Sequence, residues 1–134
     1  MRFSSGLEYS YADDVKKMAE SIVNALSLGY IDLSRLGFVR SRGSRSRQAV
    51  ARIHAVGRAW EAAFNIRPMY LIEVISERFD RLSQQEKEKV IIHELLHIPK
   101  GFSGGFVPHG RGVNRRRVDE MYAKYIEKSI LFRC

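Results

Sequence analysis

The sequence predicts a single α+β domain, in which a small twisted sheet of about three strands is packed by helices. Residues 69–76 (MYLIEVIS) are rich in β-branched and aromatic side chains, as a buried strand is. Elsewhere apolar residues recur with the period of one helical face, first at Val15, Met18, Ala19, Ile22 and Leu26. The 134 residues suffice for one hydrophobic core and are too few for two, so we expect one domain over residues 1–134.

The first helix is expected over about residues 11–28. Asp13 and Asp14 lie in its first turn, where acidic groups suit the positive end of the helix dipole. Gly29 is a fitting terminator, because glycine readily adopts the left-handed conformation that follows a helix.

A β-hairpin is predicted next, with residues 36–41 pairing with residues 49–55. A Gly-Ser-rich segment joins the two, as in a long hairpin loop. Because alanine and arginine favour helix, a helix over residues 48–64 is the alternative for the second half. Residues 57–65 are helical on either interpretation, and the strand at 69–76 follows them.

The helix over residues 83–98 is the most clearly marked element. Ser83 and Glu86 have the spacing of a capping box, and Pro99 ends the helix. For the helix predicted over residues 57–65, the main signal is the i, i+4 spacing of Trp60 and Phe64, which places the two rings on one face. After a loop, residues 114–132 form a last amphipathic helix.

The amino-acid composition is that of a soluble, basic protein. Hydrophobic residues make up 45% and charged residues 28%, and no run of about 18 apolar residues suggests a membrane span. The N-terminal residues turn acidic where a signal peptide would be apolar, so we expect a cytoplasmic protein. The one cysteine, Cys134, excludes a disulfide framework and a cysteine zinc cluster, and it fits a reducing compartment.

The net charge of +8 is concentrated in two arginine-rich segments, residues 40–52 (which include Arg47) and residues 111–117. Such segments permit binding to nucleic acid, although in many basic proteins they are simply exposed to solvent. Nucleic acid is therefore carried as an alternative partner, beside a protein or peptide substrate. The sequence leaves the oligomeric state open.

Three of the four histidines fall within residues 93–110 (HELLHIPKGFSGGFVPHG). His93, Glu94 and His97 share an arc of about 100° on a helix that is otherwise apolar. Burying two imidazoles and a carboxylate is costly unless a partner satisfies them, and a metal ion does so. The competing interpretation is that these are ordinary core or surface histidines. The HExxH spacing favours zinc bound by His93 and His97, with Glu94 as the general base of a hydrolase.

A catalytic zinc site takes three protein ligands and leaves one position open. His109 is the leading third ligand, because the glycine- and proline-rich segment before it can turn back to the metal. Glu120 is the rival, but it lies opposite the apolar face of its helix. Asp119 could orient a ligating histidine or be an exposed charge. Ser103 stands where metzincins carry their third histidine, which excludes that class.

Other polar residues keep two interpretations each. His54 is expected on a strand away from the motif, in a structural or exposed role. Glu73, inside the apolar strand, either pairs with an arginine or supports the site. Tyr70, Tyr122 and Arg111 are candidate oxyanion donors, although packing or surface exposure is the preferred interpretation of each.

Residues 70–110 (YLIEVISERFDRLSQQEKEKVIIHELLHIPKGFSGGFVPHG) closely resemble the phage-type metallopeptidase family, and the resemblance extends over roughly residues 35–130. The resemblance implies a zincin-like fold with one zinc, held by His93, His97 and His109, and Glu94 as the catalytic residue. A looser similarity is to SprT-like proteases, some of which act on DNA-attached proteins; the chain lacks the cysteine zinc ribbon that some of them carry.

The resemblance also implies how a substrate is bound. In zincin folds the strand before the active helix is commonly an edge strand that pairs with an extended peptide, here within residues 69–76. The alternative is that this strand simply completes the sheet. The predicted function is zinc-dependent hydrolysis of peptide bonds. The alternatives are a zinc-stabilised protein whose arginines bind nucleic acid, and an inactive relative that serves as an interaction module.

Overall fold

The computed structural model describes residues 6–45 and 48–133, so Arg47 and Cys134 lie outside the described residues. It is mixed α+β, as predicted, with helices packed on an open four-stranded sheet. In chain order the elements are β1 (Glu8–Tyr11), α1 (Asp13–Ala25), the 3-10 turn η1 (Leu33–Arg35), β2 (Leu36–Arg42), β3 (Ala51–Ala55), α2 (Arg58–Phe64), β4 (Tyr70–Ile75), α3 (Ser76–Phe79), α4 (Gln84–Leu96) and α5 (Arg115–Arg133). No helix of the described residues is long and apolar enough to span a membrane.

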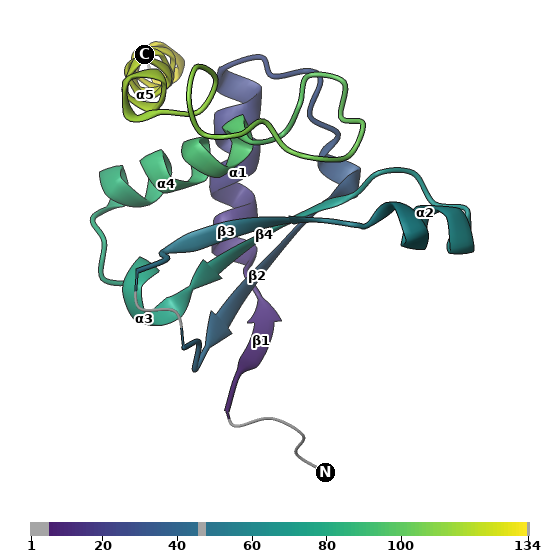
Figure 1. The fold of residues 1–134 in the computed structure, drawn as a ribbon. Helices are drawn as coiled ribbons and strands as arrows, with labels where there is room; N and C mark the ends of the chain where they lie inside the picture. The colour runs from purple at the N-terminus through teal and green to yellow at the C-terminus, as the bar shows by residue number, and fades with distance from the viewer. Residues whose placement is uncertain (1–5, 46–47, 134) are drawn as a thin grey trace.

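The strand order is β1-β2-β4-β3, with β2 and β4 parallel and the other pairs antiparallel (Figure 1). The predicted hairpin is therefore wrong, because β4 lies between β2 and β3. The prediction that β4 is the substrate-pairing edge is wrong for the same reason. Its apolar side chains suit a central position covered on both edges, whereas β3 (ARIHA) is mixed in character and forms an edge.

β1 is the strand that the sequence analysis missed. All four of its residues (EYSY) are exposed, so it lacks the apolar alternation that marks a half-buried strand. It pairs antiparallel with β2 from the register Glu8 opposite Arg42 to Tyr11 opposite Val39. Short, polar edge strands of this kind are specified by their partner more than by their own sequence.

The first helix ends at Ala25, earlier than predicted. The left-handed residue that follows it is Ser27 (φ 54°), and the Leu28 N–H returns to the Val23 carbonyl at 3.0 Å. This is the hydrogen bond of a Schellman motif, with serine where glycine is usual. Gly29 lies beyond the turn and does not end the helix.

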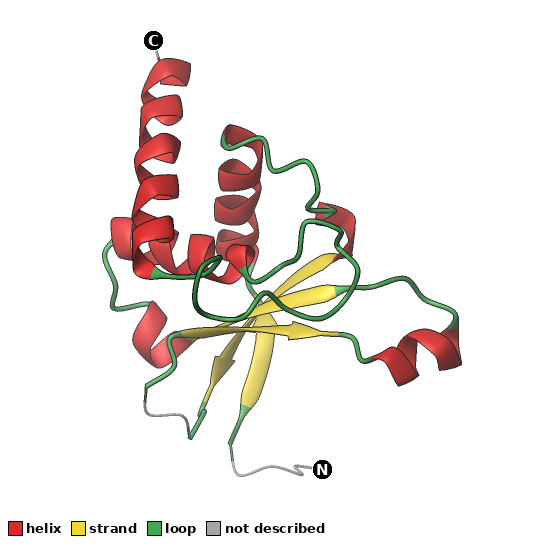
Figure 2. Cartoon of the chain, turned by 45° about the horizontal axis from the view of Figure 1, so that its top comes forward, coloured by secondary structure: helices red, strands yellow, loops and turns green. Residues whose placement is uncertain are grey.

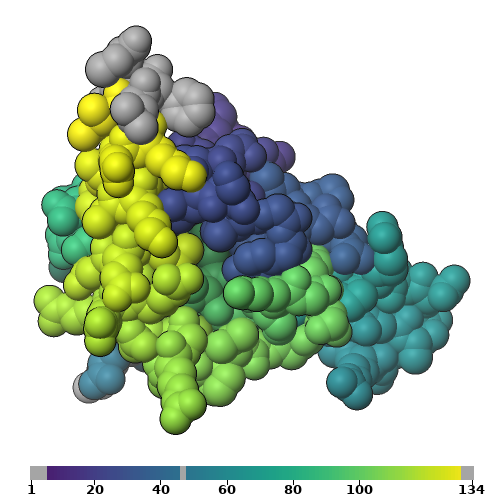
Figure 3. Space-filling view, turned by 90° about the horizontal axis from the view of Figure 1, so that it is seen from above, coloured from purple at the N-terminus to yellow at the C-terminus, as the bar shows by residue number. Residues whose placement is uncertain are grey.

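Helix α2 projects from the end of the sheet where β3 leads into it (Figures 2 and 3). Trp60 and Phe64 stack as predicted, with ring centroids 5.4 Å apart. None of its seven residues, all of which the structure describes, is buried. The helix therefore contributes nothing to the core.

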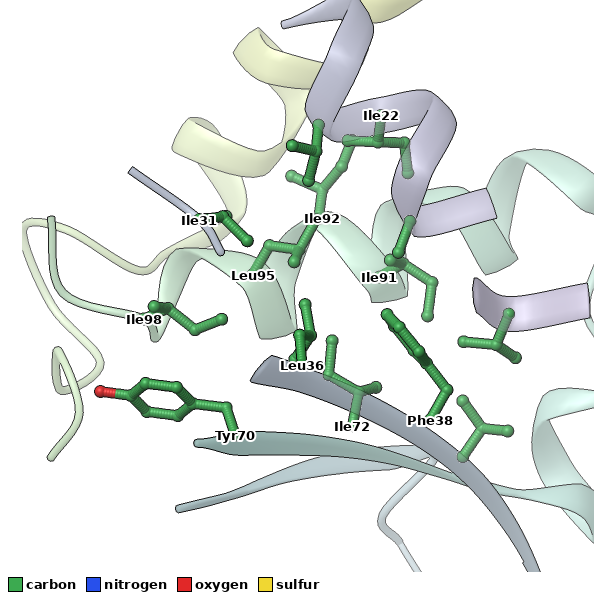
Figure 4. Packing of buried hydrophobic residues seen from close by; sticks show 14 of the residues in the cluster. Ile22, Ile31, Leu36, Phe38, Tyr70, Ile72, Ile91, Ile92, Leu95 and Ile98 are labelled. Carbon is green, nitrogen blue, oxygen red and sulfur yellow. The ribbon is translucent and has the colours of Figure 1, made fainter. Parts of the chain in front are cut away.

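The core lies between one face of the sheet and the helices α1, α4 and α5, which occupy the same side of it (Figures 1 and 4). Alternate strand residues such as Phe38, Tyr70 and Ile72 meet the apolar side of α4 at Ile91 and Leu95. The capping box begins α4 as predicted: Ser83 Oγ accepts from the Glu86 N–H, and Glu86 Oε1 accepts from the Ser83 N–H, both at 3.2 Å. This packing fixes the helix that carries the site.

Candidate metal centre

Three imidazoles converge above the sheet. His93, His97 and His109 each offer a ring nitrogen, and these nitrogens all lie within 4.8 Å of one another. The Nε2 atoms of His93 and His109 are 3.1 Å apart. Two nitrogens bound to one tetrahedral zinc at about 2.0–2.1 Å lie roughly 3.3 Å apart, so the observed spacing fits a shared metal ion.

Helix α4 positions the first two histidines. They stand one turn apart, so their rings leave the helix on the same face, with ring centroids at 5.1 Å. The residues between and around them, Ile92 and Leu95, are buried against the sheet and α1. Because these neighbours lock the helix, the histidines are held on a rigid element.

The loop after α4 is tied to His97 by its backbone. The Val107 N–H donates to the His97 carbonyl at 2.8 Å, and the His97 Nδ1–H donates to the Val107 carbonyl at 2.6 Å. With Nδ1 protonated, the Nε2 lone pair of His97 is left for a metal. The turn itself uses positive φ at Phe102, Gly104 and Gly105.

His109 is held by the start of α5. It forms an isolated bridge with Val113, and the Gly110 N–H donates to the Val113 carbonyl at 3.0 Å. Asn114 Nδ2 donates to the Gly110 carbonyl, and Asn114 Oδ1 accepts from the Arg117 N–H at 2.8 Å. Asn114 thus caps α5 and fixes the chain after His109 at once.

The charges of the site favour metal binding. Burial, followed by the neighbouring His97 and His109, lowers the pKa of His93, which favours the neutral imidazole that a metal requires. Burial raises the pKa of Glu94 to about 7. A cation beside Glu94 would favour its charged form and so counter the effect of burial. The donor set of three imidazoles beside a carboxylate suits zinc.

The histidines open onto a groove along β3. One hollow of about 370 Å³ is lined by the three histidines with Ile53 and Phe106. A second, of about 520 Å³, lies toward the start of α4 and α5. Both are bordered by Ala51, His93 and Glu94, so together they form one groove that passes the metal centre.

The remaining carboxylate candidates have other partners. Glu120 pairs with Arg116 at 3.3 Å and Arg117 at 3.7 Å on its own helix, and Asp119 pairs with Lys89 at 3.1 Å. Asp119 borders the wider hollow and is not part of the histidine cluster.

The candidate oxyanion donors also have structural contacts. The Tyr70 hydroxyl donates to the Gly105 carbonyl at 2.9 Å, which commits it to the loop. Tyr122 lies under the ammonium of Lys89, 5.3 Å from the ring centroid. These contacts support the packing interpretation for both residues.

Glu73 proves to be the centre of a buried polar cluster. It is 1% exposed, accepts hydrogen bonds from Ser41 at 2.6 Å and His54 at 2.8 Å, and forms an ion pair with Arg52 at 3.2 Å. Burial alone would raise its pKa, but the two hydrogen bonds and the charge of Arg52 outweigh it, so the pKa is lowered. The sequence left this pairing open because it joins three strands.

Comparison with protein families decides the relationship. The model of the family described as "Putative phage metallopeptidase" matches residues 7–129. The chain belongs to this family. A cluster of three histidines that could hold a metal ion is compatible with membership of a metallopeptidase family. No curated protein and no solved structure matched the chain.

Proposed function

We propose that the protein is a zinc-dependent metallopeptidase that hydrolyses peptide bonds in a polypeptide held along β3. The observation that carries this proposal is the convergence of His93, His97 and His109 beside the buried Glu94 in an open groove. A site built only to hold the fold would be closed by its fourth ligand. The family relationship supports the same class of reaction.

The three imidazoles would hold the ion through their ring nitrogens. Zinc, when bound, supplies Lewis acidity: it polarises a carbonyl and makes water a nucleophile near neutral pH. His97 is kept in the required tautomer by the Val107 carbonyl. Glu94, the residue after His93, borders both hollows, where its carboxylate accepts the proton of the attacking water and passes it to the leaving amine.

The edge of β3 suits an extended polypeptide. The Val56 N–H donates to the Met69 carbonyl, and the Ile75 N–H donates to the Val50 carbonyl. The backbone N–H and C=O groups of the even-numbered residues of β3 therefore point toward β4. By the alternation of an antiparallel ladder, Ala51 and Ile53 direct their N–H and C=O groups outward. Among the described residues no strand pairs with that edge. Main-chain pairing there would present a peptide bond to the histidines with little sequence preference.

The variant Glu94→Gln tests the proposal. It retains the shape of the side chain and leaves the histidines intact, so zinc content measured by elemental analysis should match the wild type. Cleavage of unfolded protein substrates should fall by about two to four orders of magnitude, the usual worth of a general base. Wild-type rates in the zinc-loaded variant would remove Glu94 from the mechanism.

A further inference from the structure

Helix α2 carries an aromatic surface that the core does not use. Trp60 is 62% exposed and Phe64 is 63% exposed, although their rings stack on each other. Such rings are normally buried in a domain of this size, and exposed clusters of them mark binding surfaces. We call Trp60 and Phe64 the aromatic pair.

The aromatic pair lies on the element that follows the groove-lining strand β3. Strand β3 borders the metal-site hollow at Ile53 and leads through Gly57 directly into α2. The loop of residues 100–112 lies over this end of the sheet, between α4 and α2 (Figures 1 and 3). A polypeptide that follows β3 past the histidines in this direction therefore arrives at α2.

One close approach between α2 and the loop shows which side of the helix faces the loop. A Cβ added at Gly104 would lie 3.6 Å from Glu61 Oε2, so Glu61 faces the loop. At about 100° per residue, Phe64 lies roughly 60° and Trp60 roughly 100° around the helix from Glu61, in the same direction. The aromatic pair therefore flanks the side of α2 that faces the loop.

Phe106 provides further apolar surface beside the three histidines. It lines the hollow that holds the histidines and is 46% exposed, and its ring lies 6.1 Å from that of Tyr70. Apolar surface is thus available both beside the reacting centre and beyond it. An occupant that covers both must be extended and carry apolar side chains.

We propose that the aromatic pair is a substrate-binding surface for apolar side chains of the same polypeptide, several residues from the bond that is cut. This proposal rests on the proposed function. From Ile53 to the start of α2 the chain advances five residues, roughly 16 Å if extended. Only substrates that extend about five residues beyond the metal centre would reach the pair.

Trp60 provides a direct readout, because it is the only tryptophan in the chain. The probe is a peptide of about 12 residues, long enough in extended form to span groove and α2, with leucines and phenylalanines in one half. This peptide is added to zinc-loaded Glu94→Gln protein. A control peptide, the polar twin, has serine in place of each leucine and phenylalanine. Two apolar peptides are tested, one with its N-terminal half apolar and one with its C-terminal half apolar. At least one of them should shift Trp60 emission to the blue and protect the Trp60 fluorescence from quenching by acrylamide. The polar twin should not.

The variant Phe64→Ser keeps the fluorophore and removes half of the surface. It should weaken binding of the apolar peptide on the order of tenfold, the loss expected for one buried aromatic ring. In wild-type background the same change should raise KM for the long substrate without changing kcat, and leave a four-residue substrate unaffected. The matched control is Tyr9→Ser, which removes a ring that is 59% exposed on β1, at the opposite edge of the sheet.

Three results would overturn the proposal. Trp60 emission could stay unchanged while the long peptide binds, which would place the peptide elsewhere. Emission could shift with protein concentration alone, together with dimers in sedimentation that Phe64→Ser abolishes, which would assign the pair to self-association. Single-stranded DNA could produce the shift where peptides do not. The emission assay does not depend on catalysis. It can therefore disprove the binding role of the aromatic pair while zinc-dependent cleavage is still observed.

Discussion

His97 and Val107 are joined by two hydrogen bonds: the Val107 backbone N–H donates to the His97 carbonyl, and the His97 ring Nδ1–H donates to the Val107 carbonyl. The same contact therefore sets the tautomer of a candidate metal ligand and anchors the loop that brings His109 back to it. Outer partners of this kind commonly change metal affinity by about 10- to 100-fold. The geometry of Val107 should accordingly control zinc binding although its side chain touches no metal.

Gly112→Ala tests that control. A Cβ at position 112 would lie 2.8 Å from Cγ1 of Val107, which is closer than real contacts allow, so the Val107 side chain or the backbone around Gly112 must shift. We expect zinc affinity to fall about tenfold, as measured by competition with a chelator. Gly29→Ala is the control, because a Cβ there meets nothing within 4 Å.

The companion variant Val107→Ala removes the atom that the new methyl group strikes. Combined with Gly112→Ala, it should restore most of the lost affinity, since the two changes act through one contact. If affinity stays at the wild-type value in Gly112→Ala alone, the link from Val107 to the metal centre is absent.

His109→Ala tests the third ligand. The variant should lose zinc on dialysis against a weak chelator, with affinity lowered by more than about a hundredfold because a donor atom is gone. Glu120→Ala, which removes the partner of Arg116 and Arg117, should keep stoichiometric zinc. The reverse pattern, with zinc lost only from the Glu120 variant, would reassign the ligand.

Local signals were enough to predict the helix that carries the site. The capping box at Ser83 and the HExxH spacing both act within a few residues, so α4 and the meeting of His93 with His97 follow from the sequence. The approach of His109 to these two histidines could be predicted because glycines and a proline precede it, and its role as a ligand stays a prediction. The stacked aromatic pair on α2 is likewise an i, i+4 contact.

The strand order could not be predicted, because it depends on residues far apart in the chain. Placing β4 between β2 and β3 requires a parallel crossover that no local pattern encodes. The cluster around Glu73 is a consequence of that order, since it joins Ser41 of β2 to Arg52 and His54 of β3. The bonds of Val107 are made by backbone groups, which carry no sequence signal.

Glu73→Gln should destabilise the fold in a pH-dependent way. The pKa of Glu73 is lowered from 4.5 in the folded protein, so its carboxylate adds stability above about pH 4.5 that is lost as the pH falls through the folded pKa. Near neutral pH the variant should lose about 2 kcal/mol of unfolding free energy, since Arg52 and His54 lose a buried partner. Urea unfolding followed across pH measures this.

Acid should narrow the difference between Glu73→Gln and the wild type, because protonated Glu73 is also neutral. Glu8→Gln, at an exposed position of β1, is the control and should change stability little at any pH. A constant difference across the acid range would mean that packing, rather than the charge of Glu73, is responsible.

Ile53→Pro isolates main-chain recognition at the edge of β3. The Ile53 N–H points away from β4, so proline there removes an outward donor without breaking the ladder, as edge strands tolerate. We expect KM for an unfolded protein substrate to rise about tenfold, the effect of one lost hydrogen bond, with kcat and zinc content little changed. His54→Pro is the contrasting variant: its N–H faces β4, so thermal unfolding should occur at a lower temperature. An unaltered KM in folded Ile53→Pro would show that substrates do not pair with this edge.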